Sequence, residues 1–119
     1  MTLVLGASTN PSRYSNVATE RLLAAGHDVL LLGARVGEIY GLPIETDPNP
    51  DWPPVDTVTL YLGPARQVQY YSLLVDELKP RRLIFNPGTE NAELAARARQ
   101  AGIDVEVACT LVMLSTGQY

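Results

Sequence analysis

The chain has 119 residues, which suits a single domain over residues 1–119, and its 46% hydrophobic and 18% charged residues exclude intrinsic disorder. A net charge of −4 disfavours nucleic acid as a partner, because phosphate backbones are held by basic surfaces. One cysteine and one histidine exclude a disulfide framework and argue against a bound metal, and the lack of a long apolar run predicts a cytoplasmic protein that does not span a membrane.

The first third of the chain predicts a strand, a helix and a second strand. Thr2 to Leu5 is a short apolar strand. Val17 to Ala25 predicts a helix that ends at Gly26, the residue type favoured just past a helix end. His27 to Leu32 closes on a continuous apolar run, which is typical of a strand covered on both faces in a parallel sheet.

The middle of the chain predicts a long loop, a strand and a helix. Gly33 to Pro54 is rich in glycine and proline, so we expect mostly loop there, with one short strand near Leu42 to Glu45. Asp56 to Leu62 is β-branched and apolar, as strands are. A helix should follow with Pro64 near its first position and end at Lys79-Pro80.

The last third predicts two more strands around one helix. Arg82 to Phe85 and Ile103 to Val107 are the strands, and Thr89 with Glu90 is a favourable helix start. The helix between them should bury a narrow stripe made of Leu94, Ala95, Ala98 and Ala101.

The apolar segment Leu111 to Leu114 lies close to the end of the chain, where residues fray unless they are held. We expect it to pack against the domain or against a second subunit of a homo-oligomer. The order of the elements predicts an α/β fold of the Rossmann type, in which a doubly wound, mostly parallel sheet of five to six strands lies between two helical layers.

In such a sheet, ligands bind outside the carboxyl ends of the strands where the strand order reverses. The first of these loops has small residues and hydroxyls ahead of a helix whose N-terminal N–H groups favour anions, and so it predicts a phosphate cradle. It lacks a full G-x-G-x-x-G or a P-loop, so a tight turn capped by Ser15 is the alternative. The candidate ligand residues here are Gly6, Ala7, Ser8, Asn10, Arg13, Tyr14 and Ser15.

Gly33 and Arg35 follow the second predicted strand, where NAD-binding domains place an acid for the ribose hydroxyls. An arginine at this place suits an additional phosphate on the ribose, and Arg13 would supply a second cation. Either arginine is equally well explained as a solvated surface residue.

The later loops complete the candidate site. Tyr61, followed by Gly63 and Pro64, would place a ring beside a base or an extended chain, with core packing as the alternative. Cys109 follows the last strand, so its thiol would face the ligand end of the sheet, unless it is simply a small buried hydrophobe. The loop between the predicted strand Arg82 to Phe85 and its helix, which either contacts the ligand or only begins the helix, adds Asn86, Pro87 and Gly88.

Together these residues resemble the small CoA-binding domain family, free-standing relatives of the nucleotide-binding domain in the α subunit of succinyl-CoA synthetase. The resemblance covers nearly the full length. The segments that carry it are Gly6-Ala7-Ser8 with Pro11 and Tyr14-Ser15, Gly33 with Arg35, Gly41-Leu42-Pro43, Tyr61 before Gly63-Pro64, Asn86 to Glu90, and Ala108 to Val112.

The resemblance implies binding of coenzyme A, with the first two loops at its nucleotide and phosphates and the later loops along the pantetheine arm. It implies no enzyme, because the synthetase works through a phosphorylated histidine in a further domain that this chain lacks. It also places Cys109 near the thiol of coenzyme A, where a mixed disulfide would form under oxidising conditions.

Three functions therefore remain open. The first is non-catalytic binding of coenzyme A or an acyl-CoA, with a sensing, carrier or regulatory role. The second is a small NADP-binding oxidoreductase, which Arg35 allows although no proton donor or substrate domain is evident. The third is a structural or interaction domain without a ligand.

Overall fold

The computed structural model describes residues 1–119, and seven strands form one sheet at its centre. The strands are β1 (Thr2–Leu5), β2 (Val29–Leu32), β3 (Gly37–Ile39), β4 (Leu42–Glu45), β5 (Thr57–Leu60), β6 (Arg82–Phe85) and β7 (Asp104–Val107). They lie in the order β3-β4-β2-β1-β5-β6-β7, and every neighbouring pair is parallel except β3 with β4. The predicted Rossmann-like α/β fold is confirmed.

The strand order reverses at β1. Leu5, the last residue of β1, pairs in register with Leu32 of β2 on one side and with Leu60 of β5 on the other. The chain builds outward from β1 to β2 and β4, then returns to β5 and builds outward the other way to β7. The carboxyl ends of β1, β2 and β5 therefore meet at one edge of the sheet, which is where doubly wound folds bind their ligands.

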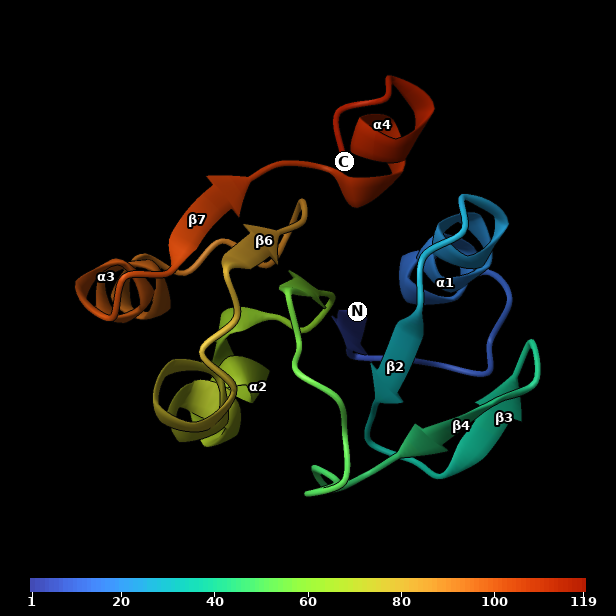
Figure 1. Ribbon diagram of the computed structural model, residues 1–119, viewed down its shortest axis with the longest axis horizontal. Coiled ribbons are helices and arrows are strands. Elements are labelled where there is room, and N and C mark those ends of the chain that lie inside the picture. Colours follow the sequence, from blue (N-terminus) through green and yellow to red (C-terminus); the bar gives the residue numbers. More distant parts are fainter.

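Helices cover both faces of the sheet. They are α1 (Tyr14–Ala24), α2 (Pro64–Gln67) with its continuation through η1 (Val68–Tyr70) and η2 (Leu73–Leu78), α3 (Ala92–Gln100) and α4 (Thr110–Ser115). Figure 1 shows α1 and α4 on one side of the sheet and α2 and α3 on the other. No helix has both the length and the apolar character needed to cross a membrane.

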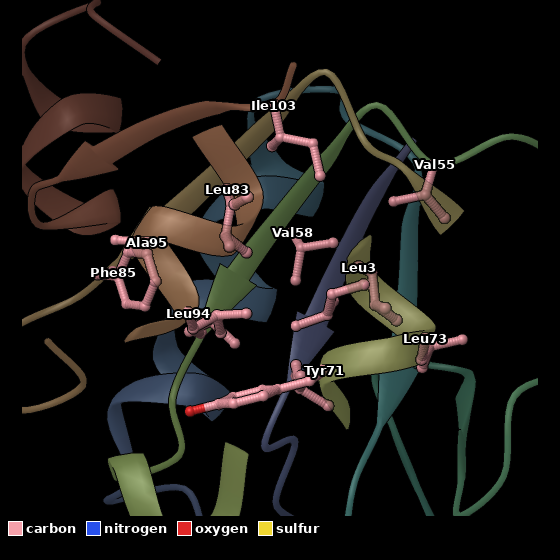
Figure 2. Close-up of a cluster of buried hydrophobic side chains, with 14 of the residues drawn as sticks. Leu3, Val55, Val58, Tyr71, Leu73, Leu83, Phe85, Leu94, Ala95 and Ile103 are labelled. Carbon is pink, nitrogen blue, oxygen red and sulfur yellow. The ribbon is translucent and has the colours of Figure 1, made fainter. Parts of the chain in front are cut away.

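Each face of the sheet has its own core, because side chains alternate along a strand. Figure 2 shows the larger cluster, in which side chains of the sheet meet those of the α2 and α3 layer. Its members from β1, β5 and β6 are Leu3, Leu5, Val58, Leu60, Leu83 and Phe85, and those from the helices include Tyr71, Leu94 and Ala98. The smaller cluster, under α1, consists of Val4, Ala7, Leu22, Val29, Leu31, Ile39 and Ile44.

The expected count of five to six strands is wrong, because β3 adds a seventh. It pairs antiparallel with β4 through a hairpin whose turn residues both have positive φ, 51° at Tyr40 and 79° at Gly41. Two-residue hairpin turns of this kind favour asparagine or aspartate before the glycine. Tyr40 is not a typical residue of such a turn, so the sequence pattern predicts a loop at this place.

Two predicted helix starts are also wrong. The first helix begins at Tyr14, ahead of the expected Val17. The third is capped by Asn91, whose Oδ1 accepts a hydrogen bond from the N–H of Leu94 (3.2 Å), so Thr89 and Glu90 lie in the loop before it. An asparagine cap satisfies one of the four N–H groups left free at a helix start, as Thr89 was expected to do.

The remaining expectations concern ends of elements. Ala101 is exposed, so the buried stripe of α3 ends at Ala98. Lys79 adopts a left-handed conformation (φ 44°) before Pro80, which ends the preceding helix as expected.

The apolar C-terminal segment forms α4, which packs against α1 of the same chain and buries Met113, in agreement with the expected packing against the domain.

Candidate functional site

All the predicted ligand residues lie in the loops that follow carboxyl ends of parallel strands or in the first helical turn after such a loop. The loops after β1, β2 and β5 meet at the reversal of strand order, and those after β6 and β7 continue the same edge. We call this region the carboxyl edge and define it by residues 6–15, 33–35, 61–67, 86–91 and 108–110.

Backbone contacts at two glycines hold three of these loops together. Gly6 has a φ of 102°, and a Cβ on it would lie 3.0 Å from the carbonyl carbon of Tyr61. A Cβ on Gly33 would lie 2.5 Å from the carbonyl oxygen of Ala7. The N–H groups of Gly6 and Ala7 both donate to the Leu32 carbonyl oxygen, at 2.8 and 3.0 Å. Only glycine fits at these two positions, where the backbones of neighbouring loops approach closely.

The loop after β1 is held by its own polar side chains. Ser8 Oγ accepts from the N–H of Asn10, and Asn10 Oδ1 accepts from both the N–H and the Oγ of Ser12. Asn16 of α1, which the sequence analysis did not single out, donates through Nδ2 to the Ser8 carbonyl oxygen (2.9 Å) and accepts from the Tyr40 hydroxyl (2.5 Å). Asn16 thus joins the loop to the β3–β4 hairpin.

The N-terminus of α1 faces this loop with free donors. Arg13 is the N-cap residue and makes no side-chain capping bond, and the N–H groups of Tyr14 and Ser15 donate to no protein atom. Ser15 therefore does not cap this helix, and it lies buried in the first helical turn. Free N–H groups at the start of an 11-residue helix are suited to a phosphate.

Exposed arginines add positive charge to the carboxyl edge. Arg13 and Arg35 are exposed and form no ion pair. Arg66, in the first turn of α2, is a further exposed arginine without an ion pair that the sequence analysis did not single out. Guanidinium groups free of carboxylate partners are available to bind phosphate oxygens.

Tyr61 follows β5 and packs its ring against the smaller core cluster. Its hydroxyl is buried without a hydrogen-bond partner. Burial raises the pKa of Tyr61 to about 12, and the nearby hydroxyls of Thr59 and Thr110 oppose this shift. The phenol is therefore neutral at physiological pH, and the side chain belongs largely to the core, one of the two roles expected for it.

Asn86 is only 2% exposed, and its amide is fully used inside the protein. Its Nδ2 donates to Thr59 Oγ1 (2.7 Å) and to the Leu60 carbonyl oxygen (2.8 Å), while its Oδ1 accepts from the N–H of Thr110 (2.8 Å). The Asn86 side chain thus braces β5, β6 and α4 against one another. Pro87 and Gly88 form the exposed tip of the same loop.

The sequence does not indicate the roles of two further amide side chains, one buried and one partly buried. Gln67 is fully buried and its Nε2 donates to the carbonyl oxygens of Leu62 and Thr89, both at 2.8 Å. Asn91 donates through Nδ2 to Gln67 Oε1 (2.9 Å) and to the Tyr71 hydroxyl (2.8 Å). Spacing along the chain offered no signal for these contacts, because the bonded residues lie up to 24 positions apart.

Cys109 is a free, partly exposed cysteine at the N-cap position of α4. The next residue, Thr110, hydrogen-bonds through Oγ1 to Thr59 Oγ1 at the end of β5 (2.8 Å). This contact keeps the backbone around Cys109 at the carboxyl edge, on the side of the loops after β5 and β6.

A hollow of about 440 Å³ lies elsewhere, between η2 and α3, and is lined in part by Tyr71, Asp76 and Arg97. Arg97 already lies over the Tyr71 ring (5.1 Å) and near Glu93 (3.9 Å). Its charge is therefore satisfied within the protein. Free helix N-terminal N–H groups and several arginines without ion pairs occur together at the carboxyl edge, and we place the candidate site there.

A family profile described as a CoA binding domain matches residues 1–115 of the chain. The crystal structure of an uncharacterised protein is 45% identical with a TM-score of 0.93, and the alignment covers 99% of this chain and 96% of that one. A hypothetical protein from Pyrococcus horikoshii OT3 is 23% identical with a TM-score of 0.86, over 97% of this chain and 81% of that one.

The structure of cell-free ID.343 from Thermus thermophilus is also 23% identical with a TM-score of 0.86, over 99% of this chain and 89% of that one. These two more distant structures share the fold. No protein with a curated function matches the chain.

Proposed function

This chain belongs to the CoA-binding domain family, and from that premise we propose that it binds coenzyme A or an acyl-CoA at its carboxyl edge. One observation carries the proposal: unpaired arginines and the free N–H groups of α1 occur together at the reversal of strand order. Coenzyme A carries a diphosphate and a ribose phosphate, which need such donors, and it supplies a thiol that bears acyl groups as thioesters.

Each loop would bind a different part of coenzyme A. Arg13 and the N–H groups of Tyr14 and Ser15 would hold the diphosphate, since they combine a cation with helix N-terminal donors. Arg35, after β2, would hold the ribose phosphate. The loops after β5 and β6 would follow the pantetheine arm toward Cys109.

We propose a non-catalytic role in sensing, carrying or regulating through the bound cofactor. Asn86 is fully bonded within the fold, so it acts as a brace for the site. The Tyr61 phenol, with its pKa raised to about 12 by burial, is a poor acid or base at neutral pH. The properties of these two residues therefore favour a ligand-binding role over a catalytic role.

Thermal unfolding with and without ligands tests the proposal. We expect coenzyme A and acetyl-CoA to raise the midpoint by several degrees, because a ligand at 100 times its Kd stabilises by about 2.7 kcal/mol. NADP and NAD at the same concentration serve as controls and should leave the midpoint unchanged. A shift with NADP alone would favour the oxidoreductase, and no shift with any ligand would favour a structural domain and reject the proposal.

A further inference from the structure

Gln67 links two loops of the carboxyl edge through a single side chain. It is the last residue of α2, it is 0% exposed, and both of its amide hydrogens are used. One is donated to the Leu62 carbonyl oxygen in the loop after β5, and the other to the Thr89 carbonyl oxygen in the loop after β6. The orientation of these two peptide groups is therefore fixed by the same residue.

Fixing a carbonyl also fixes the N–H group that follows it. The chain has no cis peptide bond, so each peptide unit is planar with its C=O and N–H pointing in opposite directions. With the carbonyls of Leu62 and Thr89 turned toward buried Gln67, the N–H groups of Gly63 and Glu90 point away from it. Both N–H groups belong to exposed residues and donate to no protein atom.

The Gln67 side chain is itself held in place. Its Oε1 accepts from Asn91 Nδ2 (2.9 Å), and the same Nδ2 also donates to the Tyr71 hydroxyl (2.8 Å). Asn91 Oδ1 is anchored in turn by the N–H of Leu94 at the start of α3. A buried amide whose partners are all satisfied has one orientation, because any other orientation would leave a buried polar group without a hydrogen bond.

We infer that Gln67 is a positioning residue that presents the Gly63 and Glu90 N–H groups to amide carbonyl oxygens of the pantetheine arm. This inference rests on the proposed function. Backbone N–H groups are uncharged donors, which match the two uncharged amides of pantetheine. The phosphates have their own donors at α1 and Arg35, beside the loops after β1 and β2.

The test compares coenzyme A with 3′,5′-ADP, its nucleotide half, in amide-detected NMR titrations of the whole chain. In the wild type, the Gly63 and Glu90 signals should shift with coenzyme A and stay in place with 3′,5′-ADP. Gln67→Met removes the donors at nearly constant volume. We expect it to weaken coenzyme A binding about tenfold, the loss of one to two hydrogen bonds, and to change 3′,5′-ADP binding by less than about twofold.

Gln69→Met is the matched control, because Gln69 lies on the same helical segment and is exposed. It should bind both ligands as the wild type does. If Gln67→Met does not fold, Asn91→Ser replaces it, since serine still caps α3 while the donor to Gln67 is lost. This variant should show the same preferential loss of coenzyme A, to a smaller extent.

Two results would overturn the inference alone: Gly63 and Glu90 signals that do not respond to coenzyme A bound by the wild type, or an equal loss of both ligands in the variant. An equal loss would mean that Gln67 only stabilises the fold. Failure of the wild type to bind coenzyme A would instead reject the proposed function, and the inference with it.

Discussion

Gly33 illustrates how the site depends on backbones that approach too closely for a side chain. Its φ is not positive, so conformational freedom does not explain the glycine. The reason is contact: a Cβ would lie 2.5 Å from the Ala7 carbonyl oxygen and 3.1 Å from Ile44 Cγ2. The loop after β1 must therefore stay close to the end of β2, which brings the candidate phosphate loop toward Arg35.

Replacement of Gly33 by alanine should force these backbones apart. We expect Gly33→Ala to lower the free energy of unfolding by about 1–3 kcal/mol, the usual cost of overpacking. Urea denaturation would measure this loss, with Gly63→Ala as the control for stability, since a Cβ on Gly63 would meet nothing within 4 Å and its φ is −65°. Equal stability of the two variants would show that the loop after β1 moves freely away from β2.

Residues of the site differ in how well the sequence predicts them. The positions of Gly6 and Gly33 could be predicted, because parallel strands place their carboxyl ends on one edge wherever the strands are recognised. Gln67 could not, because it differs from exposed Gln69 only in partners that the folded chain brings to it. The role of Asn86 as an internal brace depends likewise on Thr59 and Leu60, 27 and 26 positions away.

The same distinction holds among the elements. The sequence predicts β1, β2, β5 and β6 to within two residues at each end, because each contains a local run of apolar or β-branched residues. In the β3–β4 hairpin, the sequence predicts β4 but not β3, because Gly37–Ile39 is only three residues long and Tyr40 is an unusual turn residue. The start of α3 was misplaced because Thr89 and Asn91 are both good caps, and tertiary contacts decide between them: Thr89 Oγ1 donates to the Asn86 carbonyl oxygen instead.

At the C-terminal end, α4 is followed by an aromatic anchor. The Tyr119 hydroxyl lies 2.5 Å from Thr2 Oγ1, the Arg82 guanidinium lies 4.5 Å from the centre of the Tyr119 ring, and the His27 ring meets it edge-on at 4.8 Å. Thr2 and Arg82 begin β1 and β6, so Tyr119 reaches back to the amino ends of the strands. The segment after α4 thereby becomes part of the domain.

Removal of this anchor should destabilise the protein. We expect Tyr119→Ala to cost about 2 kcal/mol, from the lost ring contacts, the cation–π interaction and the hydrogen bond. Tyr119→Phe keeps the ring and should cost about 1 kcal/mol, the value of the single hydrogen bond. Thermal unfolding would resolve both losses as shifts of several degrees. If the alanine variant melted with the wild type, Tyr119 would not hold α4.

Over the whole molecule, two arginines at the amino end of β6 form ion pairs, whereas Arg13, Arg35 and Arg66 of the carboxyl edge form none. Arg81 is bonded to Asp56 (2.9 Å) and Arg82 lies near Glu106 (3.7 Å), both at or beside the start of β6. The hydrogen bond from Arg81 lowers the pKa of Asp56 to about 2, so this carboxylate stays ionised to balance its partner. A protein with a net charge of −4 can thus still attract a polyanion locally.

This distribution predicts which phosphate of coenzyme A depends on which arginine. We expect Arg35→Gln to weaken coenzyme A binding about tenfold at low salt and to leave 3′-dephospho-CoA unaffected, because a hydrogen bond to a charged group contributes about 1.5–3 kcal/mol. Arg21→Gln is the control, since Arg21 is an exposed arginine without an ion pair in the last turn of α1, away from the carboxyl edge.

Calorimetric titrations at low and high salt would measure these affinities, and the salt dependence should be shallower in the Arg35 variant, because one screened attraction is gone. An equal loss for both ligands would assign Arg35 to the diphosphate. An unchanged affinity for coenzyme A would leave Arg35 as a solvated residue and move recognition of the ribose phosphate to another part of the carboxyl edge.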